Sequence, residues 1–393
     1  MDHTTPAATL GVVGGGQLGR MLGEAAGPLG VDVLVSDPTP ECPASSVVKR
    51  QFLGDFDDEE TIRSLAEDVD VLTYEIELAD PDALAAVAAE TDTPVHPDPE
   101  TLRTIQDKLV QTRHFAEAGV PVPEFRRVDD ADDLRAAGEE LGWPLMLKAR
   151  EGGYDGRGNM PVSGPEEAAE AVEAIGGPAL AEAFVDFECE LAVIGVVGAD
   201  EVKTFPVTET IHRAEILRET VSPARVGEAT RTEARAVALD VLESLDGRGV
   251  YGIELFAADR GDGTEILLNE VAPRPHNSGH WTIEGCVTSQ FEEHVRATLG
   301  WPLGDVSRTA PTALANLLGD VDEPEPVALD GVETILEAPR AALHWYGKRE
   351  ARPLRKMGHV TLPAPAGVDP DDRETVETLL EDVRALRDST TFR

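Results

Sequence analysis

The sequence predicts a mixed fold in three parts: an N-terminal α/β domain, a central α+β domain and a small β-rich C-terminal domain. Three observations support this prediction. Strand-like and helical segments alternate over the first hundred residues, several strand-like segments follow one another in the middle, and the chain becomes proline-rich after about residue 300. We place the boundaries near residues 105 and 300, which gives domains over 1–105, 106–300 and 301–393.

The N-terminal elements follow the alternation that produces a parallel sheet. Three apolar strands are expected, and Pro81 marks the start of a helix after the third. A long helix is expected over 101–119, because Pro121 and Pro123 mark its exit. The three expected strands are 8–13, 31–37 and 70–77.

The central domain begins with an apolar strand over 143–150 that leads into a glycine-rich loop. Consecutive strand-like segments then predict an antiparallel sheet. A helix is expected over 231–246, followed by two apolar strands joined by the turn DRGDGT. The C-terminal domain is expected to hold short strands and one terminal helix over 372–388.

The chain is strongly acidic, with 34 basic and 75 acidic side chains in 393 residues and a net charge of −41. Nucleic acids and anionic membranes are themselves polyanions, so the charge argues against both as partners. We find no apolar segment long enough for a transmembrane helix and no signal-peptide pattern. The three cysteines are far apart and predict neither a disulfide framework nor a zinc cluster. We expect a soluble cytoplasmic enzyme.

The acidic residues are spread along the whole chain, and the 34 basic residues comprise only 6 lysines against 28 arginines. Such a surface repels itself in dilute salt, and the repulsion weakens as the Debye length falls to ~3 Å at 1 M salt. We therefore interpret the chain as a protein from a salt-adapted organism. Basic residues inside motifs stand against this acidic trend and are candidates for anion binding.

The first glycine motif, GxGxxG, lies between a strand and a helix at Gly14–Gly19. Glycines at such a turn let backbone amides approach a phosphate at the helix N-terminus. Asp37 follows the next strand, where a nicotinamide enzyme would hold a ribose. The motif alone leaves three interpretations open: a dinucleotide site, a monophosphate site or a tight turn without a ligand.

A second glycine-rich segment follows Lys148, with four glycines between Gly152 and Gly158. Such a loop can close over a triphosphate, although it lacks the pattern of a Walker loop. Lys148 ends an apolar strand, and Lys108 is another of the six lysines. Both are candidates for neutralising nucleotide phosphates, and the alternative is that both are solvated surface lysines.

Two acids lie on the apolar strands around the turn DRGDGT, Glu254 on the first and Glu270 on the second. A carboxylate beside buried hydrophobes is costly unless it is paired or binds a cation. Mg²⁺ typically takes one or two carboxylates together with substrate phosphates, so this pair, supported by Asn269, predicts a Mg²⁺ site. The alternative is a pair of salt-bridged strand acids. The polar segment that follows, 272–281, is expected to be an active-site loop, and Pro275 argues against a helical histidine–zinc site.

With these motifs the sequence resembles the ATP-grasp superfamily and, within it, the N5-carboxyaminoimidazole ribonucleotide synthase family. The resemblance extends over nearly the whole chain. Two residues depart from the family pattern, Glu215 and Leu354, and neither removes a chemical group. The segments that carry the resemblance are GGGQLGRM (14–21), TYEIE (73–77), GGYDGRGN (152–159), ILRETVSPA (216–224), NEVAPRPHNSGHWT (269–282) and HWYGKREARPLRKMGH (344–359).

The resemblance implies an ATP-grasp fold with a pre-ATP-grasp N-terminal domain and a small β-rich C-terminal domain. It also implies a reaction of purine biosynthesis, in which ATP, bicarbonate and 5-aminoimidazole ribonucleotide give N5-carboxyaminoimidazole ribonucleotide, ADP and phosphate through carboxyphosphate. ATP and Mg²⁺ would be required. A homodimer and functional coupling to a mutase that consumes the unstable product are further expectations.

The resemblance also implies roles for individual residues. Mg²⁺ would be held by Glu254 and Glu270. ATP would contact Lys108, Lys148, Gly153, Tyr154, Asp155, Gly156, Arg157, Gly158, Asn159, Glu182, Phe184, Val185, Glu190, His212, Asn269 and Glu270. The ribonucleotide and bicarbonate would contact Gly16, Gln17, Leu18, Glu75, Tyr154, Arg157, Asn277, Ser278, Lys348 and Arg355. The catalytic candidates are Asp155, Arg274, His276 and Lys348, with Asp155 placed to accept a proton from the amine.

Three alternative functions are weighed against this one. A sister ATP-grasp enzyme, such as a formate-dependent glycinamide ribonucleotide transformylase or a biotin carboxylase, shares the phosphate and metal groups but not the substrate end, GYDGRG and the tail motif. An oxidoreductase would use the first glycine motif and Asp37, but would leave the second glycine loop and the acidic pair without a role. A non-catalytic ligand-binding protein would have no need of all the charged groups.

Overall fold

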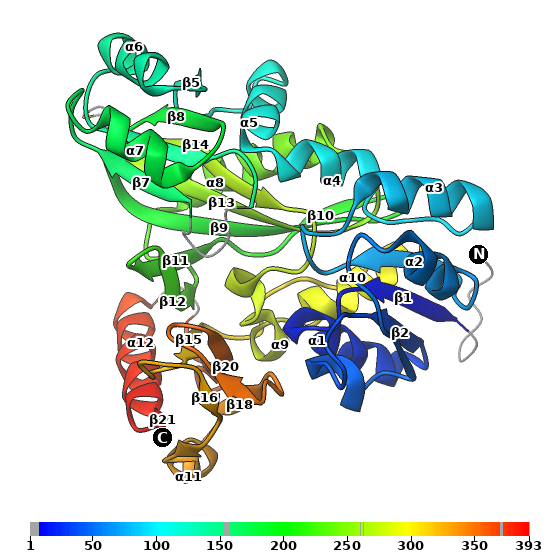
Figure 1. The fold of residues 1–393 in the computed structure, drawn as a ribbon. Helices are drawn as coiled ribbons and strands as arrows, with labels where there is room; N and C mark the ends of the chain where they lie inside the picture. The colour runs from blue at the N-terminus through cyan, green and yellow to red at the C-terminus, as the bar shows by residue number, and fades with distance from the viewer. Residues whose placement is uncertain (1–7, 153–157, 260, 262, 370–371, 393) are drawn as a thin grey trace.

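The computed structural model describes residues 8–152, 158–259, 261, 263–369 and 372–392. Its elements form an N-terminal α/β unit, a small projecting lobe and a large antiparallel sheet that runs into the C-terminal region (Figure 1). The mixed fold predicted from the sequence is confirmed. No helix among these described residues is long and apolar enough to cross a membrane.

The N-terminal unit is a parallel sheet with the strand order β3-β2-β1-β4. Its central strands are apolar and buried because helices cover both faces, as in other βαβ arrangements. The sheet contains one short strand, β3, that the sequence pattern did not predict. The elements are β1 (Thr9–Val13), α1 (Gln17–Ala26), β2 (Asp32–Ser36), β3 (Arg50–Phe52), α2 (Glu59–Ala66), β4 (Val71–Tyr74) and α3 (Pro81–Thr91).

The long helix predicted over 101–119 is two helices, α4 (Pro99–Gln106) and α5 (Lys108–Glu117). Asp107 separates them with an extended backbone, and its side chain accepts hydrogen bonds from the amides of Leu109 and Val110. The same carboxylate forms an ion pair with Arg150. Aspartate is a strong N-cap, so it restarts the helix where an uninterrupted periodicity predicts continuation. The break places Lys108 at the first position of α5.

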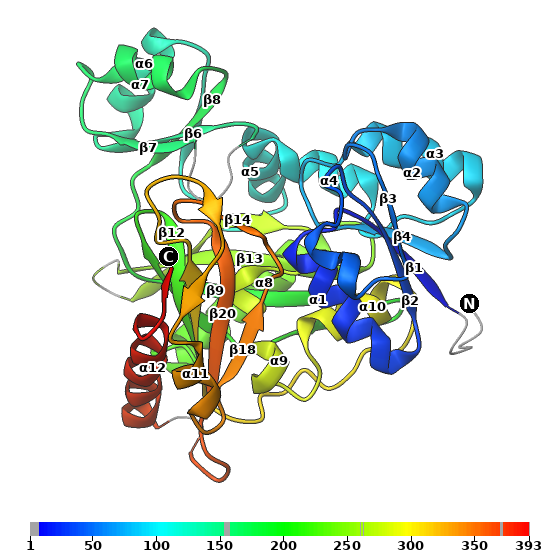
Figure 2. The same cartoon turned by 60° about the horizontal axis from the view of Figure 1, so that its bottom comes forward.

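The projecting lobe is a four-stranded antiparallel sheet in the order β5-β8-β6-β7, with two helices packed against it (Figure 2). It has its own apolar core, which includes Leu134, Leu145 and Leu147. The second glycine-rich segment falls between β6 and β7 in the sequence. The elements are β5 (Phe125–Val128), α6 (Ala131–Leu141), β6 (Leu145–Ala149), β7 (Asn159–Val162), α7 (Ala168–Ile175) and β8 (Ala179–Ala183).

The large sheet has nine strands, in the order β14-β13-β9-β11-β12-β15-β20-β18, with β10 paired to β9. The pairing of β12 with β15 carries the sheet across residue 300. Helix α8 packs against β9, β13 and β14, and α10 packs against α1 of the N-terminal unit. The elements are β9 (Phe187–Val197), β10 (Val202–Thr204), β11 (Thr208–Arg213), β12 (Ile216–Ser222), α8 (Glu228–Glu243), β13 (Gly249–Asp259), β14 (Thr264–Ala272), α9 (Thr282–Gly285) and α10 (Gln290–Thr298).

The terminal helix α12 lies against the large sheet (Figure 1). Its apolar residues join a core with β15 and β20, and Arg384 and Arg387 form ion pairs with the fully buried Glu219 of β12. These contacts make α12 a packing element. The C-terminal elements are β15 (Thr312–Leu318), β16 (Glu325–Pro326), β17 (Leu329–Asp330), α11 (Val332–Glu337), β18 (Ala342–Trp345), β19 (Glu350–Ala351), β20 (Lys356–Pro363), α12 (Arg373–Asp388) and β21 (Thr391–Phe392).

Candidate active site

The first glycine loop is built around a glutamate side chain. Glu75, just after β4, accepts hydrogen bonds from the amide of Gly16 and, at 2.7 Å, from the amide of Gly19. A Cβ atom added at Gly14 would lie 2.5 Å from the Cγ of Glu75, and one at Gly16 would lie 2.8 Å from its Oε1. Glycines are therefore needed here because a carboxylate packs against the loop at the start of α1, where the helix dipole favours negative charge.

Asp37 belongs to the same structure. It accepts hydrogen bonds from the amides of Gly15 (3.0 Å) and Thr39 (2.8 Å), and it is almost completely buried. Both carboxylate oxygens therefore hold the loop together. Asp37 is thus engaged within the loop, whereas the dinucleotide interpretation requires it to bind a ribose. The carboxylate of Glu75 also occupies two of the backbone amides that a pyrophosphate would need.

The expected contact of Gly16, Gln17 and Leu18 with a phosphate is supported only in part by this geometry. The amide of Gly16 is engaged by Glu75, and Leu18 is buried. The side chain of Gln17, in contrast, accepts a hydrogen bond of 2.9 Å from Nζ of Lys348. Lys348 comes from the C-terminal region, so this contact brings two predicted substrate residues together across 331 positions of sequence. Nearby, Arg355 donates to the backbone oxygen of Glu350.

The two predicted ATP lysines each pair with another predicted site residue. Lys108 forms a 2.5 Å ion pair with Glu270 of β14. Lys148 forms a 2.6 Å ion pair with Glu182 of β8, and it also donates to Oδ1 of Asn269 at 3.1 Å. The side chains of Lys148 and Glu182 are 8% and 6% exposed, so this pair is buried between the projecting lobe and the large sheet.

The two predicted metal ligands face each other. Glu254 and Glu270 are direct partners in the antiparallel pairing of β13 and β14, next to a β-bulge. Burial raises the pKa of Glu254 above its ordinary value. Burial also opposes the ionisation of Glu270, but the ammonium of Lys108 outweighs it and holds the pKa of Glu270 at about 2. Two acids placed opposite each other repel, and a divalent cation between them would remove that repulsion.

This donor set fits Mg²⁺ bound together with nucleotide phosphates. Within the part of the chain that the structure describes, no cluster of three or more histidine, cysteine or acidic side chains could hold a metal by itself. Two carboxylates leave most coordination positions open, as Mg²⁺ requires when phosphate oxygens and water complete its shell. The arrangement does not resemble a closed zinc site.

Two further predicted nucleotide residues on the large sheet, Glu190 of β9 and His212 of β11, contact each other. His212 and Glu190 form a 2.8 Å hydrogen bond, Nδ1 to Oε2. Burial alone would lower the pKa of His212, but the contact with Glu190 raises it. Phe184 is 49% exposed and Val185 is half-buried, so both can contact a ligand. Gly158 and Asn159 lie at the end of the glycine-rich loop, while Gly153, Tyr154, Asp155, Gly156 and Arg157 lie outside the described residues.

His276 occupies the loop after β14, beside the metal strands. Its Nδ1 accepts a hydrogen bond from the amide of Ser278 and lies 2.8 Å from the Ser278 hydroxyl. Because Nδ1 accepts, the proton of the neutral ring lies on Nε2. Burial and the charge of Arg274 lower the pKa of His276 to about 3. His276 is therefore a neutral hydrogen-bonding group, and its Nδ1 lies 3.8 Å from Oε1 of Glu254.

Asn277 and Ser278 are predicted to bind substrate, but both side chains are buried. Asn277 exchanges hydrogen bonds with Asn316 of β15 and donates to Nδ1 of His280 at 3.0 Å. The hydroxyl of Tyr346 lies 3.1 Å from that same nitrogen, and Tyr346 precedes Lys348 by two residues. The geometry supports an indirect role for Asn277 and Ser278, since their polar groups hold the loop and His276 in place. Their direct contact with substrate stays a prediction.

Several groups that support the site were not predicted from the sequence. Glu77 forms an ion pair with Arg274, although it belongs to the motif TYEIE from which only Glu75 was selected. Asn316 and Tyr346 complete the buried network below the loop. Lys356, from the tail motif, is an electrostatic neighbour of both Glu254 and His276. Only Glu77, Tyr346 and Lys356 lie in recognised motifs, so Asn316 carried no sequence signal.

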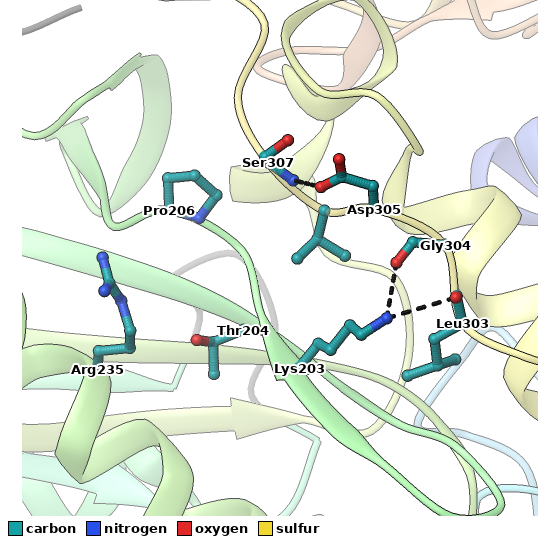
Figure 3. Close-up of a pocket in the computed structure, with 9 residues that line it drawn as sticks. Lys203, Thr204, Pro206, Arg235, Leu303, Gly304, Asp305 and Ser307 are labelled. Atoms are coloured by element: carbon teal, nitrogen blue, oxygen red, sulfur yellow. Dashed lines mark hydrogen bonds between the residues drawn. The ribbon is translucent and has the colours of Figure 1, made fainter.

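An open pocket of about 620 Å³ lies elsewhere, between β10, α8 and the segment after α10 (Figure 3). Lys203 points into it, but its ammonium is bound to the backbone oxygens of Leu303 and Gly304. Asp305 adds a negative charge to the same wall. The pocket contains none of the predicted site residues, and its lysine is used to hold the loop, so we do not place the active site there.

Comparison with known families divides the chain into three matched segments. Residues 7–106 match the ribonucleotide synthetase pre-ATP-grasp domain, and residues 113–291 match the ATP-grasp domain. Residues 312–368 match the phosphoribosylaminoimidazole carboxylase C-terminal domain.

Full-length relatives decide the family. The N5-carboxyaminoimidazole ribonucleotide synthase of Brucella melitensis is 41% identical over 93% of this chain and 99% of that relative. The chain belongs to the N5-carboxyaminoimidazole ribonucleotide synthase family. The synthase of Synechococcus elongatus is 36% identical over 97% of this chain and 96% of its own. The chain spans only 64% of another similar protein, the phosphoribosylaminoimidazole carboxylase of Schizosaccharomyces pombe, which is 41% identical.

Solved structures of the synthase family share the whole fold. The carboxyaminoimidazole ribonucleotide synthase of Aspergillus clavatus, complexed with ATP, has a TM-score of 0.87 at 37% identity and covers 98% of this chain and 99% of its own. The same enzyme with ADP and 5-aminoimidazole ribonucleotide has a TM-score of 0.86. The Thermotoga maritima synthetase reaches 0.86 at 39% identity. The chain is thus an ATP-grasp ligase of purine biosynthesis, as the sequence motifs predicted.

Proposed function

We propose that this synthase uses ATP to activate bicarbonate as carboxyphosphate and transfers the carboxyl group to the amine of 5-aminoimidazole ribonucleotide. The products are N5-carboxyaminoimidazole ribonucleotide, ADP and phosphate. The observation that supports this reaction most directly is that the predicted metal ligands lie close to the predicted substrate residues. Glu254 of the ATP-grasp strands lies 3.8 Å from His276, Oε1 to Nδ1. Lys348, the partner of Gln17, donates to the backbone oxygen of Lys356, whose charge acts on both Glu254 and His276.

The phosphate end of the reaction depends mainly on charge and position. We infer that Lys108 and Lys148 neutralise the ATP phosphates, and that Glu254 and Glu270 hold Mg²⁺ with those phosphates. Lys108 is paired with Glu270 in the described structure, so it lies within reach of whatever binds at that acid. When bound, Mg²⁺ would neutralise the charge that develops on the transferred phosphoryl group. Asn269 and Glu182 position Lys148 between the lobe and the sheet.

The acceptor end would be formed by Lys348, Gln17 and Arg355 for the ribonucleotide phosphate, with Glu75 beside them. The neutral ring of His276 presents Nε2–H as a donor, because Nδ1 is occupied by Ser278. Together with the charge of Arg274, this donor suits an anionic oxygen of bicarbonate or carboxyphosphate. Closure over these groups would protect the labile anhydride from water. Asp155, Tyr154 and Arg157 remain predicted contributors from outside the described residues.

Several wider properties are also proposals. The acidic surface suits a salt-adapted cytoplasmic enzyme, and the family suggests a homodimer. The product is unstable, so functional coupling to a mutase that consumes it is expected. The strongly negative charge supports the expectation that neither nucleic acid nor an anionic membrane is a partner.

The proposed reaction is tested by ADP release in molar KCl with Mg²⁺, adding bicarbonate and 5-aminoimidazole ribonucleotide separately and together. We expect strong stimulation by the ribonucleotide and a requirement for bicarbonate. Stimulation by formate or another amine instead would keep the ATP-grasp mechanism and overturn the substrate assignment. That outcome would favour a sister enzyme such as a formate-dependent transformylase.

A further inference from the structure

The side chain of Arg274 is held by a residue from another part of the chain. Its Nη2 lies 2.6 Å from Oε1 and 2.8 Å from Oε2 of Glu77. Glu77 lies three residues after β4 of the N-terminal sheet, whereas Arg274 lies two residues after β14 of the large sheet. The ion pair therefore connects the loop that carries Glu75 to the strand that carries Glu270.

Glu77 is itself fixed in position. Gln106, the last residue of α4, donates hydrogen bonds to the backbone oxygens of Glu77 (2.7 Å) and Ala79 (2.8 Å). Two residues earlier, Glu75 is bound to the start of α1. The loop is anchored on both sides of Glu77, so its carboxylate can act as a fixed point for a partner.

Arg274 has competing acidic neighbours. Besides Glu77, its charge interacts with Glu75 and with Glu270, the predicted metal ligand. Its Nη1 donates to the backbone oxygen of Pro275, so two contacts set the plane of the guanidinium. Burial disfavours the charged form, but these acids raise the pKa of Arg274 above its ordinary value. Without Glu77, the guanidinium would be free to turn toward Glu270 and occupy a carboxylate that Mg²⁺ needs.

We propose that Glu77 is a positioning residue that holds the guanidinium of Arg274 beside the bicarbonate position and away from the metal carboxylates. This inference rests on the proposed function, in which Arg274 acts on bicarbonate or carboxyphosphate. It adds a residue outside the predicted site and gives the second acid of TYEIE a role. Both partners of this pair are in the chain itself, so the role can be tested without a partner protein.

The test compares Glu77→Gln and Glu77→Asp with a matched control, Glu41→Gln. Glu41 likewise forms an ion pair with a distant residue, Arg349 of the C-terminal region, but both of these side chains are exposed. We expect Glu77→Gln to raise the KM for bicarbonate or lower kcat by about tenfold or more, because a partly buried arginine loses its fixed partner. The KM for ATP should change by less than about twofold, Glu77→Asp should recover part of the loss, and Glu41→Gln should have no effect.

A double-mutant cycle distinguishes the positioning of Arg274 by Glu77 from a general loss of folded structure. In an Arg274→Gln background, Glu77→Gln should cost nothing further, because the group that it positions is gone. Normal kinetics in Glu77→Gln would overturn the proposal. So would a lowered Tm with a parallel rise in every KM, since that pattern indicates a general structural role. Normal kinetics in Arg274→Gln alone would instead show that the role of Arg274 in the proposed function is wrong, and the positioning role would fall with it.

Discussion

Glu254 and Glu270 lie directly opposite each other on β13 and β14, and Glu270 forms an ion pair with Lys108. Glu254 lies 3.8 Å from His276, Oε1 to Nδ1, and that ring is neutral because burial lowers its pKa to about 3. The charges of His212 and Lys356 also act on Glu254. Burial keeps the pKa of Glu254 above its ordinary value, whereas the charge of Lys108 outweighs burial at Glu270 and holds its pKa at about 2. A cation that binds together with a substrate would stabilise the charged form of both carboxylates.

We predict that Glu270→Gln abolishes turnover and leaves the fold intact. The change removes the charge of a metal ligand and the partner of Lys108 but hardly alters the volume. ADP release should fall by about a hundredfold or more, and far-ultraviolet circular dichroism should be unchanged. Glu233→Gln on the exposed side of α8 is the control and should keep full activity. Normal ADP release in Glu270→Gln would show that the metal assignment is wrong.

Lys148→Met tests the buried pair between the lobe and the large sheet. It would leave Glu182 buried and unpaired, which should lower the free energy of unfolding by about 3 kcal/mol. ATP affinity should also fall, because a phosphate-binding charge is lost. Lys49→Met provides the comparison, since the Lys49–Asp32 pair is exposed and should contribute no more than about 1 kcal/mol.

The double variant Lys148→Met/Glu182→Leu separates the two effects of Lys148. Replacing both charges with apolar groups should restore much of the stability, because no unpaired charge remains in the interior. ATP binding, measured by calorimetry, should stay weak. Recovery of ATP affinity in the double variant would contradict a direct role for Lys148 at the phosphates.

The strands and most helices of this fold could be predicted because their patterns are local. Alternating apolar segments gave β1, β2 and β4, and the two strands around DRGDGT pair as expected. The predicted helix over 101–119 was wrong as a single element because Asp107 caps a new helix and pairs with Arg150, 43 positions away. Periodicity cannot detect a contact of that kind.

Within the candidate site, too, contacts between distant segments could not be predicted from the sequence. Lys148, Glu254 and Glu270 could be selected because charged residues on apolar strands are conspicuous in sequence, and Lys108 because the chain has only six lysines. The role of the first glycine motif was not predictable, since the pattern that suits a phosphate also suits the side chain of Glu75. Side-chain contacts between distant segments decide such cases, and a sequence pattern does not contain them.

Glu75 should make stability depend on pH. Burial raises its pKa from the ordinary value of 4.5 to about 7, although the amides of Gly19 and Gly16 oppose the change. The folded state therefore holds this proton more tightly than the unfolded state. The stabilisation is complete below pH 4.5 and is lost as the pH rises to about 7, by up to about 3 kcal/mol. Urea unfolding of wild type and Glu75→Gln between pH 4.5 and 8 measures this contribution.

The difference between the two profiles isolates Glu75, because Glu293 also has a pKa raised to about 7, chiefly by burial, and is present in both proteins. Glu75→Gln should be less stable at low pH by about 1 kcal/mol, since its amide group cannot accept both backbone hydrogen bonds. Its stability should then fall less steeply than that of wild type as the pH rises. Parallel profiles would show that Glu75 does not titrate in this range.

The acidic surface predicts a strong dependence of stability on salt. With a net charge of −41, repulsion among exposed carboxylates should destabilise the folded state until counterions screen it. We expect the Tm to rise by about 10 °C or more between 0.1 and 2 M KCl, because the Debye length falls from ~10 Å to below ~3 Å over that range. Glycine betaine at matched osmolality is the control, since an excluded but uncharged osmolyte strengthens burial without screening. A Tm that is independent of KCl, or that betaine raises equally, would contradict salt adaptation through surface charge.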